Sequence, residues 1–228
     1  MKHLIETADS SSLATVPYDR IVLDSTENDV IVKGGGYEYV DLGLPSGLKW
    51  ATMNVGAESE TDYGYYFQWG DIEDKSNADC TLKSYKYYDG TINKITKYTS
   101  TDGKTTLEPE DDATTQIMGG KWRMPTQTEC QELLENTENE WVEDYNSTGV
   151  NGRKFTSKTD KNKYIFIPAS GYRLGSSFKY QPKVGYLWSS SLTTNFRENA
   201  DSLHVQSFLS KAKNDPREYA MPTRGVFK

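Results

Sequence analysis

Histidine and cysteine, the side chains that most often carry metal or nucleophilic chemistry, are scarce in this chain of 228 residues. The two histidines are His3 and His204, and the two cysteines are Cys80 and Cys130. A zinc or iron site needs several imidazoles or thiolates that converge, so we expect neither a bound metal nor a cofactor. His204 could serve a Ser/His/Asp hydrolase site, but its alternating strand context favours a solvent-facing histidine. Cys130 lies on the apolar side of a predicted helix, which favours a buried free thiol.

The sequence motifs of common enzymes are absent as well. Gly34-Gly35-Gly36 leads into a strand pattern, so it is no phosphate loop before a helix, and no Gly-x-Ser-x-Gly elbow occurs. The acidic run Glu108-Pro109-Glu110-Asp111-Asp112 could hold a hard cation, although such a run is more often a solvated loop. We therefore predict that the chain has no catalytic residues and is not an enzyme.

Charge and hydrophobicity limit the class of partner. The net charge is -7, and the chain lacks the cluster of Lys and Arg that a phosphate-binding surface needs, so we expect no nucleic-acid partner. No apolar run approaches the length of a membrane span, and we expect no membrane insertion. Residues 1–9 lack the apolar stretch of a secretory signal, which leaves export by another route or removal of a leader. The 16 tyrosines suit exposed binding surfaces and half-buried strands equally well.

Residues 1–36 differ from the rest of the chain and predict an N-terminal arm. The β-branched runs Arg20–Asp24 and Val30–Lys33 are separated by five polar residues, which is typical of a short hairpin. Gly34-Gly35-Gly36 then breaks the pattern and predicts a linker. A lone hairpin is marginally stable in water, so we expect the arm to pair with the main domain or to join a homo-oligomer.

From Tyr37 onward, the pattern predicts one domain, residues 37–228. Thr126 and Glu129 form a capping-box motif, and apolar residues follow at helical spacing, which predicts a helix over about 128–137. Residues 76–112 are polar and rich in tyrosine with Asp-Gly turns, so we expect an insertion with exposed hairpins. The predicted class is α+β, with short twisted antiparallel strands, few helices and much irregular structure. Strand patterns cover residues 37–42, 48–53, 63–70, 163–168, 185–189 and 202–208.

Three motifs follow one another in the predicted domain. They are Tyr39–Ala51 (YVDLGLPSGLKWA), Gly120–Glu129 (GKWRMPTQTE) and Gly185–Ser191 (GYLWSSS), and the chain ends with Arg217 through Arg224-Gly225-Val226. In order and spacing, residues 37–228 resemble the large paralogous family of Bacteroidetes surface and phage proteins, which is related to the formylglycine-generating sulfatase modifiers. The resemblance implies a C-type-lectin-like fold for residues 37–228 and gives no information on residues 1–36.

The motif residues are expected to hold the scaffold, with Trp122, Met124 and Trp188 in the core and Arg123 bridging backbone carbonyls. Enzymes related to this family bind copper through late cysteines or iron through a histidine cluster, and residues 186–228 contain no cysteine. The resemblance therefore favours a binding protein. The signatures of calcium-dependent lectins are also missing, since Gln181-Pro182-Lys183 is only loosely similar to a sugar-binding tripeptide.

Some proteins of the broader fold are variable proteins of diversity-generating retroelements, in which late strands and loops display the variable residues. The equivalent stretch here is 190–218, although an ordinary solvated loop has a similar composition. Strand alternation should point Leu203 and Val205 inward and the polar residues to one exposed face. The predicted ligand-binding residues are Thr193, Thr194, Asn195, Arg197, Asn199, Asp201, His204, Gln206 and Asn214.

These features predict a non-catalytic protein that binds a cell-surface receptor, either a protein or a glycan. The leading interpretation is a receptor binder of a phage or prophage tail, because the N-terminal hairpin could join a fibre. The alternative is a secreted or lipid-anchored bacterial adhesin. A degenerate enzyme of the sulfatase-modifier type is disfavoured by the missing cysteines. Both leading interpretations place the protein outside the cell, on a virion tail or on a bacterial surface.

Overall fold

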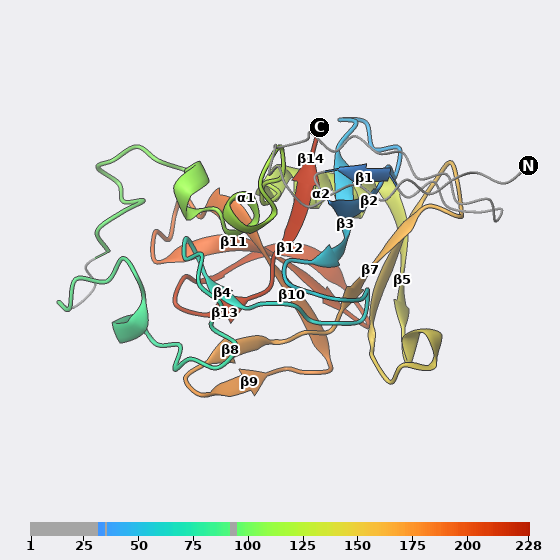
Figure 1. Cartoon of the computed structure of the whole chain (residues 1–228). Coiled ribbons are helices and arrows are strands. Elements are labelled where there is room, and N and C mark those ends of the chain that lie inside the picture. The colour runs from blue at the N-terminus through green and yellow to red at the C-terminus, as the bar shows by residue number, and fades with distance from the viewer. Residues whose placement is uncertain (1–31, 35, 92–94) are drawn as a thin grey trace, which may run out of the picture.

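The computed structural model describes residues 32–34, 36–91 and 95–228 (Figure 1). It is mostly β-sheet, with 37% strand and 13% helix, and its strands form four small antiparallel sheets. The α+β class expected from the sequence is therefore wrong. Segments without a strand pattern of their own, such as 137–142 and 210–216, are paired as strands, and this adds β structure that the sequence did not reveal. Within the described residues, we find no helix with the length and apolar character needed to cross a membrane.

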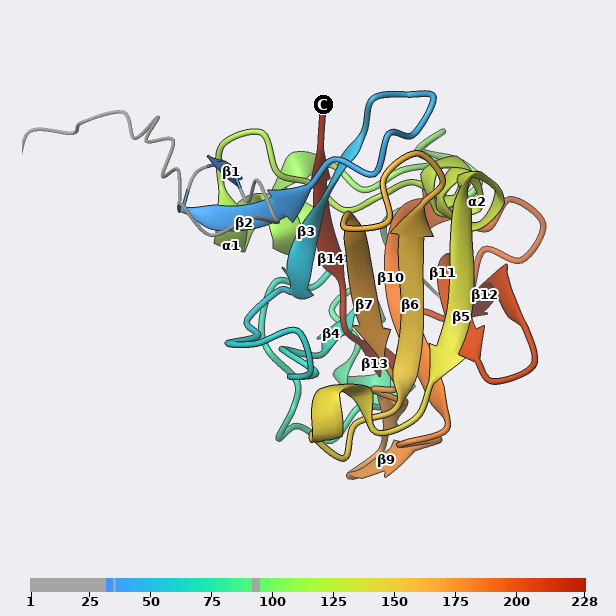
Figure 2. The ribbon, with the colours of Figure 1, turned by 90° about the vertical axis from the view of Figure 1, so that its right-hand side faces the viewer.

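Two of the sheets are seen side by side in Figure 2. One of them joins both ends of the described chain, because β14 pairs with β3 and places Val226 opposite Trp50. The other is a meander in which β6 pairs with β5 and with β7. In spatial order, the strands of the first sheet are β1 (Val32–Gly34), β2 (Tyr37–Val40), β3 (Lys49–Asn54) and β14 (Arg224–Phe227). The strands of the second sheet are β5 (Thr137–Val142), β6 (Gly152–Ser157) and β7 (Tyr164–Pro168).

The other two sheets carry the candidate site. The central sheet has the order β10-β11-β12, and a sheet of short strands has the order β4-β13-β8-β9. The strands of the central sheet are β10 (Val184–Leu192), β11 (Asn199–Gln206) and β12 (Ser210–Pro216). The strands of the other sheet are β4 (Phe67–Gln68), β13 (Ala220–Met221), β8 (Tyr172–Leu174) and β9 (Ser177–Lys179).

The central sheet separates two clusters of buried apolar side chains. Strand alternation sends Leu187, Leu203 and Val205 to one cluster, where they meet side chains of β6 and β7. Tyr186 and Trp188 point to the other cluster, and the Trp188 ring Nε1 donates a hydrogen bond to a backbone carbonyl at 2.8 Å. The predicted core position of Trp188 and the inward positions of Leu203 and Val205 are confirmed.

Helix α2 (Gln127–Asn136) begins where the sequence places it. Thr126 is the N-cap, and both hydrogen bonds of the predicted capping box with Glu129 are present. Arg123 donates two hydrogen bonds to the same carboxylate, at 2.6 and 2.7 Å, and one to a backbone carbonyl, so its expected role toward carbonyls is the minor one. Cys130 is a buried free thiol, as predicted. The shorter helices are α1 (Ala113–Met118) and the 3-10 helices η1 (Leu82–Ser84), η2 (Pro109–Asp111) and η3 (Tyr145–Ser147).

The tyrosine-rich segment 76–112 packs against the second core cluster. Tyr85, Tyr87 and Tyr98 are buried there with Trp69, and the Tyr85 hydroxyl donates to the Trp69 carbonyl at 2.9 Å. The predicted exposed hairpins are partly confirmed, because an antiparallel bridge pairs Tyr88 with Ile95 and residues 89–91 beside it are exposed. The burial of the tyrosine rings was not predicted, and it arises because each ring buries a large apolar area even when its sequence neighbours are polar.

Little of the predicted N-terminal arm belongs to the described residues. β1 pairs antiparallel with β2, so Gly34, which the sequence predicts as linker, lies in a strand opposite Tyr37. Gly36 has a φ of 87° and lies in the turn between the two strands. The predicted hairpin of residues 20–33 lies outside the described residues except for Val32 and Lys33.

Candidate functional site

Four tyrosines from separate segments converge on one face of the central sheet. Tyr172 belongs to β8 and Tyr186 to β10, while Tyr180 follows β9 and Tyr219 precedes β13. Tyr186 is paired directly with His204 of β11, and the two rings are in contact. We call the four tyrosines together with His204 the tyrosine cluster.

The rings of the tyrosine cluster contact one another closely. Tyr172 and Tyr219 are stacked, with centroids 4.6 Å apart and an interplanar angle of 3°. Tyr186 lies edge-on to Tyr172 at 5.1 Å and to His204 at 4.3 Å. Tyr180 lies 5.8 Å from Tyr172 and is 57% exposed. The cluster is therefore an aromatic surface with fixed inner rings and an outer ring that meets solvent.

The local backbone holds Tyr172 and Tyr180 in place. Gly171 has a φ of 62°, and a Cβ atom there would meet the Lys179 carbonyl oxygen at 2.2 Å, so glycine is required for this close approach. Tyr180 has a φ of 60°, a left-handed conformation that bulky residues rarely adopt. Its carbonyl accepts hydrogen bonds from the backbone N–H groups of Lys183 and Val184, at 2.7 and 3.0 Å. This turn compensates for the strain and keeps the Tyr180 ring beside Tyr172.

Next to the aromatic rings, Ser202 and His204 share one carboxylate. Asp215 of β12 accepts a hydrogen bond from Ser202 Oγ at 2.5 Å and lies 2.6 Å from His204 Nε2, and both contacts use Oδ2. Ser202 is buried, and the side chains of His204 and Asp215 are 8% and 13% exposed. Buried polar groups in folded proteins are paired, and the shared carboxylate pairs these two and fixes the imidazole under the tyrosines.

The same geometry argues against the Ser/His/Asp hydrolase that the sequence left open. In such enzymes the histidine lies between the serine and the acid, so that it can take the serine proton. Here Asp215 lies between Ser202 and His204, and the serine hydroxyl donates to the carboxylate. Ser202 is also buried, so a substrate carbonyl has no access to its Oγ. The three side chains support the face and do not form a nucleophile.

The hydroxyls of Tyr172, Tyr186 and Tyr219 stay protonated at neutral pH. Burial raises the pKa of Tyr172 to about 12, and burial also raises the pKa of Tyr186 and of Tyr219 above the ordinary value. A protonated phenol both donates and accepts hydrogen bonds. The cluster therefore combines apolar ring faces with polar edges.

The ligand-binding residues predicted on β11 do not share one exposed face. Because side chains alternate along a strand, Asn199 and Asp201 point to the same side as buried Leu203, whereas His204 and Gln206 point to the other side. His204 is buried and Gln206 is half-buried. The predicted exposure of His204 is wrong because β11 is the middle strand of its sheet and is covered on both faces.

The remaining predicted residues lie in or beside the loop between β10 and β11. Thr193 is buried and donates to Asp201 at 2.7 Å, and Asn199 donates to Asn214 at 2.8 Å. Arg197 donates to two backbone carbonyls of the segment 99–104, at 3.0 and 3.4 Å, so it anchors that segment. Thr194, Asn195 and Asn214 are exposed. The structure thus unites one predicted residue, His204, with the tyrosine cluster.

The tyrosines themselves were missed as site residues. Tyr172, Tyr180 and Tyr186 stand within 15 residues of one another, which is the one signal that the sequence offers for them. Strand propensity explains such tyrosines equally well, and only the pairing of β8 with β13 brings Tyr172 to Tyr219.

Lysines neutralise the acidic run 108–112. Carboxylate oxygens of Glu108, Glu110 and Asp111 lie within 4.8 Å of one another, and Lys97 contacts them at 2.7, 3.4 and 2.5 Å. Lys86 contacts Asp111 at 2.8 Å. Burial alone raises the pKa of Asp111, but hydrogen bonds from Lys86 and Lys97 outweigh it and hold that pKa well below the ordinary range. The ammonium groups supply the positive charge that a hard cation would bring, and the run is an ion-pair network.

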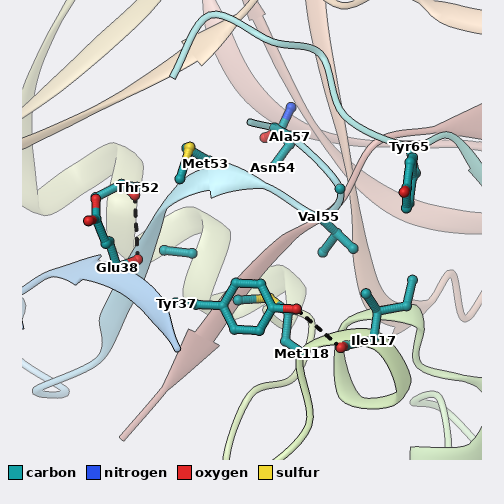
Figure 3. A pocket seen from close by; sticks show the side chains of 12 residues that line it. Tyr37, Glu38, Thr52, Met53, Asn54, Val55, Ala57, Tyr65, Ile117 and Met118 are labelled. Carbon is teal, nitrogen blue, oxygen red and sulfur yellow. Dashed lines mark hydrogen bonds between the residues drawn. The ribbon is translucent and has the colours of Figure 1, made fainter. Parts of the chain in front are cut away.

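A pocket of about 220 Å³ lies beside β3 and α1 (Figure 3). Its walls include Tyr37, Val55, Tyr65 and Met118. The Tyr37 hydroxyl donates to the Ile117 carbonyl at 3.3 Å and ties the start of β2 to the end of α1. The lining of the pocket does not include the tyrosine cluster.

No protein-family model, curated protein or solved structure matches the chain. These comparisons therefore give no support to the C-type-lectin-like fold that the sequence resemblance implied. The geometry of the tyrosine cluster is the observation that bears on function.

Proposed function

We propose that this protein binds a cell-surface receptor without catalysing a reaction, and that the tyrosine cluster is its binding surface. One observation carries the proposal: tyrosines from four segments converge on Tyr172, with Tyr172 and Tyr219 stacked at 4.6 Å and the outer ring, Tyr180, 57% exposed. Tyrosine provides a large contact area at a low cost in conformational entropy. Rings that are already fixed lose little further freedom on binding.

The polar groups beside the rings support binding over catalysis. Asp215 is shared by Ser202 and His204, so the imidazole is held in place by a carboxylate instead of activating a hydroxyl. Protonated tyrosine hydroxyls add donors and acceptors at the rim of the apolar surface. Such a surface recognises a ligand by contact and hydrogen bonding.

The proposed binding surface lies away from the loop of residues 193–198. That loop precedes Asn199 at the start of β11, whereas His204 lies five residues further along the strand, which corresponds to about 17 Å. Receptor binding would take place outside the cell. The leading candidate is a receptor binder on a phage or prophage tail, and the alternative is an adhesin on the surface of a bacterium. The receptor would be a protein or a glycan.

The test is a cell-binding assay with fluorescently labelled protein on a panel of gut bacterial strains. Tyr180→Ala should weaken binding at least tenfold, as expected for a central aromatic contact. Tyr65→Ala is the matched control, because Tyr65 is another exposed tyrosine and lines the separate pocket. Thermal melts verify that both variants are folded. Wild-type binding by a folded Tyr180→Ala protein, or binding of the wild type to no strain, would count against the proposal.

A further inference from the structure

Four exposed lysines surround the tyrosine cluster. The register places Lys179 of β9 opposite Tyr172, and Lys211 of β12 opposite His204. Residues paired across neighbouring strands share a face of the sheet, so both lysines project on the same side as the rings. Lys183 follows in the turn that begins at Tyr180. We call the four together the lysine rim: Lys179, Lys183, Lys211 and Lys213.

The lysine rim differs from the lysines of the acidic run. Lys86, Lys97 and Lys104 form ion pairs with carboxylates at 2.8 Å or less, whereas none of the rim lysines has an ion-pair partner among the residues that the structure describes. Asp215 and Glu218 are acidic residues in the same region as the lysine rim. Asp215 is already shared by two side chains, and burial raises the pKa of Glu218. In a chain of net charge -7, the rim is therefore a local positive surface.

We infer that the receptor bound by the tyrosine cluster is an acidic polysaccharide, whose anionic groups contact the lysine rim while a sugar ring lies on Tyr180. This inference rests on the proposed function. The C–H face of a sugar ring matches an exposed aromatic face, and protonated phenols can bond to sugar hydroxyls. Lysine ammonium groups form charge-assisted hydrogen bonds with carboxylates and sulfates.

The charge of the whole chain favours a polysaccharide over a nucleic acid. A nucleic acid carries a charge at every phosphate and needs an extended basic surface, whereas this protein is acidic overall. In an acidic polysaccharide each anionic group is attached to a sugar ring whose C–H face is uncharged, so anionic groups and apolar ring faces alternate along the chain. That alternation suits one exposed ring with lysines on both sides of it.

Binding of the full-length protein to immobilised polysaccharides tests the inference. The probes are polygalacturonate as a carboxylated chain, chondroitin sulfate as a sulfated chain, dextran as a neutral chain, and poly-L-glutamate as an acidic peptide. At least one acidic polysaccharide should bind. The affinity for dextran should be at least tenfold lower, and the affinity for poly-L-glutamate should also be lower than that for the acidic polysaccharide. Physiological salt should weaken binding, because the rim is exposed and its charges are screened.

Variants of the rim separate its role from that of the rings. Lys179→Gln and Lys211→Gln should each lower the affinity about two- to fivefold, and the double variant should lower it about tenfold. Lys121→Gln removes the same charge from an exposed position between α1 and α2 and should change nothing. Thermal melts verify that each variant is folded.

Failure of the inference can be distinguished from failure of the proposed function. If dextran and poly-L-glutamate bind as well as the acidic polysaccharides, or if the rim variants bind normally while Tyr180→Ala does not, the inference is overturned and the proposed function stands. The same holds if no polysaccharide binds but cell binding still depends on Tyr180. If acidic polysaccharides bind and neither Tyr180→Ala nor the rim variants weaken that binding, the site lies elsewhere. Both the inference and the proposed function are then overturned.

Discussion

Asp215 is the side chain whose removal should disturb the candidate site most. Asp215→Ala deletes the acceptor that Ser202 Oγ contacts at 2.5 Å and His204 Nε2 at 2.6 Å, and both groups are buried. A buried polar group without a partner costs about 1–3 kcal/mol, and two such groups remain, so the free energy of unfolding should fall by about 2–6 kcal/mol. For a domain of this size, 1 kcal/mol corresponds to about 2–4 °C, so the Tm should fall by about 4–24 °C.

Urea unfolding followed by tryptophan fluorescence measures this loss. Asp215→Asn keeps one acceptor oxygen and should lose about half as much as Asp215→Ala. A double-mutant cycle with Ser202→Ala should give a coupling energy of about 1–2 kcal/mol, because the two side chains are in direct contact. A loss below about 1 kcal/mol for Asp215→Ala, at an unchanged m-value, would refute the buried arrangement.

Burial and charge lead to three further predictions. Leu203→Ala should lower the free energy of unfolding by about 2–5 kcal/mol through the cavity it leaves. Thr194→Ala, at an exposed position, should change that free energy by at most about 0.5 kcal/mol. Equal losses of the two variants in thermal melts would contradict the buried position of Leu203 and the exposed position of Thr194. The pKa of Asp111 is held below its ordinary range, so the ionised carboxylate stabilises the fold above about pH 4 and this effect is lost as the pH falls further. In urea unfolding from pH 5 to pH 2, the free energy of unfolding should therefore fall more steeply for the wild type than for Asp111→Asn. Burial raises the pKa of Tyr172 to about 12, so between pH 10 and 12 the folded state keeps a proton that the unfolded state loses, and stability should fall by up to about 1.4 kcal/mol per pH unit from this residue. Tyr172→Phe should remove that share of the slope, and an unchanged slope would contradict it.

Features encoded over a few residues could be predicted from the sequence. The capping box of Thr126 and Glu129 places the start of α2 within one residue of its expected position, because cap and helix are neighbours along the chain. The inward positions of Leu203 and Val205 were predicted for a similar reason, since strand alternation is a local pattern.

Features that depend on distant pairing could not be predicted. The polar segment 210–216 has no alternating apolar pattern, yet it pairs along its whole length with β11. That pairing turns β11 into a middle strand and buries His204, which a single strand pattern would expose. The same limit explains the wrong fold class, because the extra strands are visible only through their partners.

The candidate site shows the limit most clearly. Tyr172 and Tyr219 are 47 residues apart by their numbers and become stacked only because β8 pairs with β13. Tyr85, Tyr87 and Tyr98 of the segment 76–112 have a similar composition around them and are buried instead. Residue type alone does not separate a tyrosine of the core from a tyrosine of a binding surface.

Protection of single tyrosines from chemical modification tests the central claim most directly. Hydroxyl-radical footprinting of the protein, alone and bound to a strain that it recognises, reports the solvent access of Tyr180 and Tyr65 in one experiment, and both are exposed in the free protein. If the tyrosine cluster is the binding surface, bound cells should lower the modification rate of Tyr180 at least fivefold and leave that of Tyr65 unchanged. Equal modification of Tyr180 in the free and bound protein would contradict the claim.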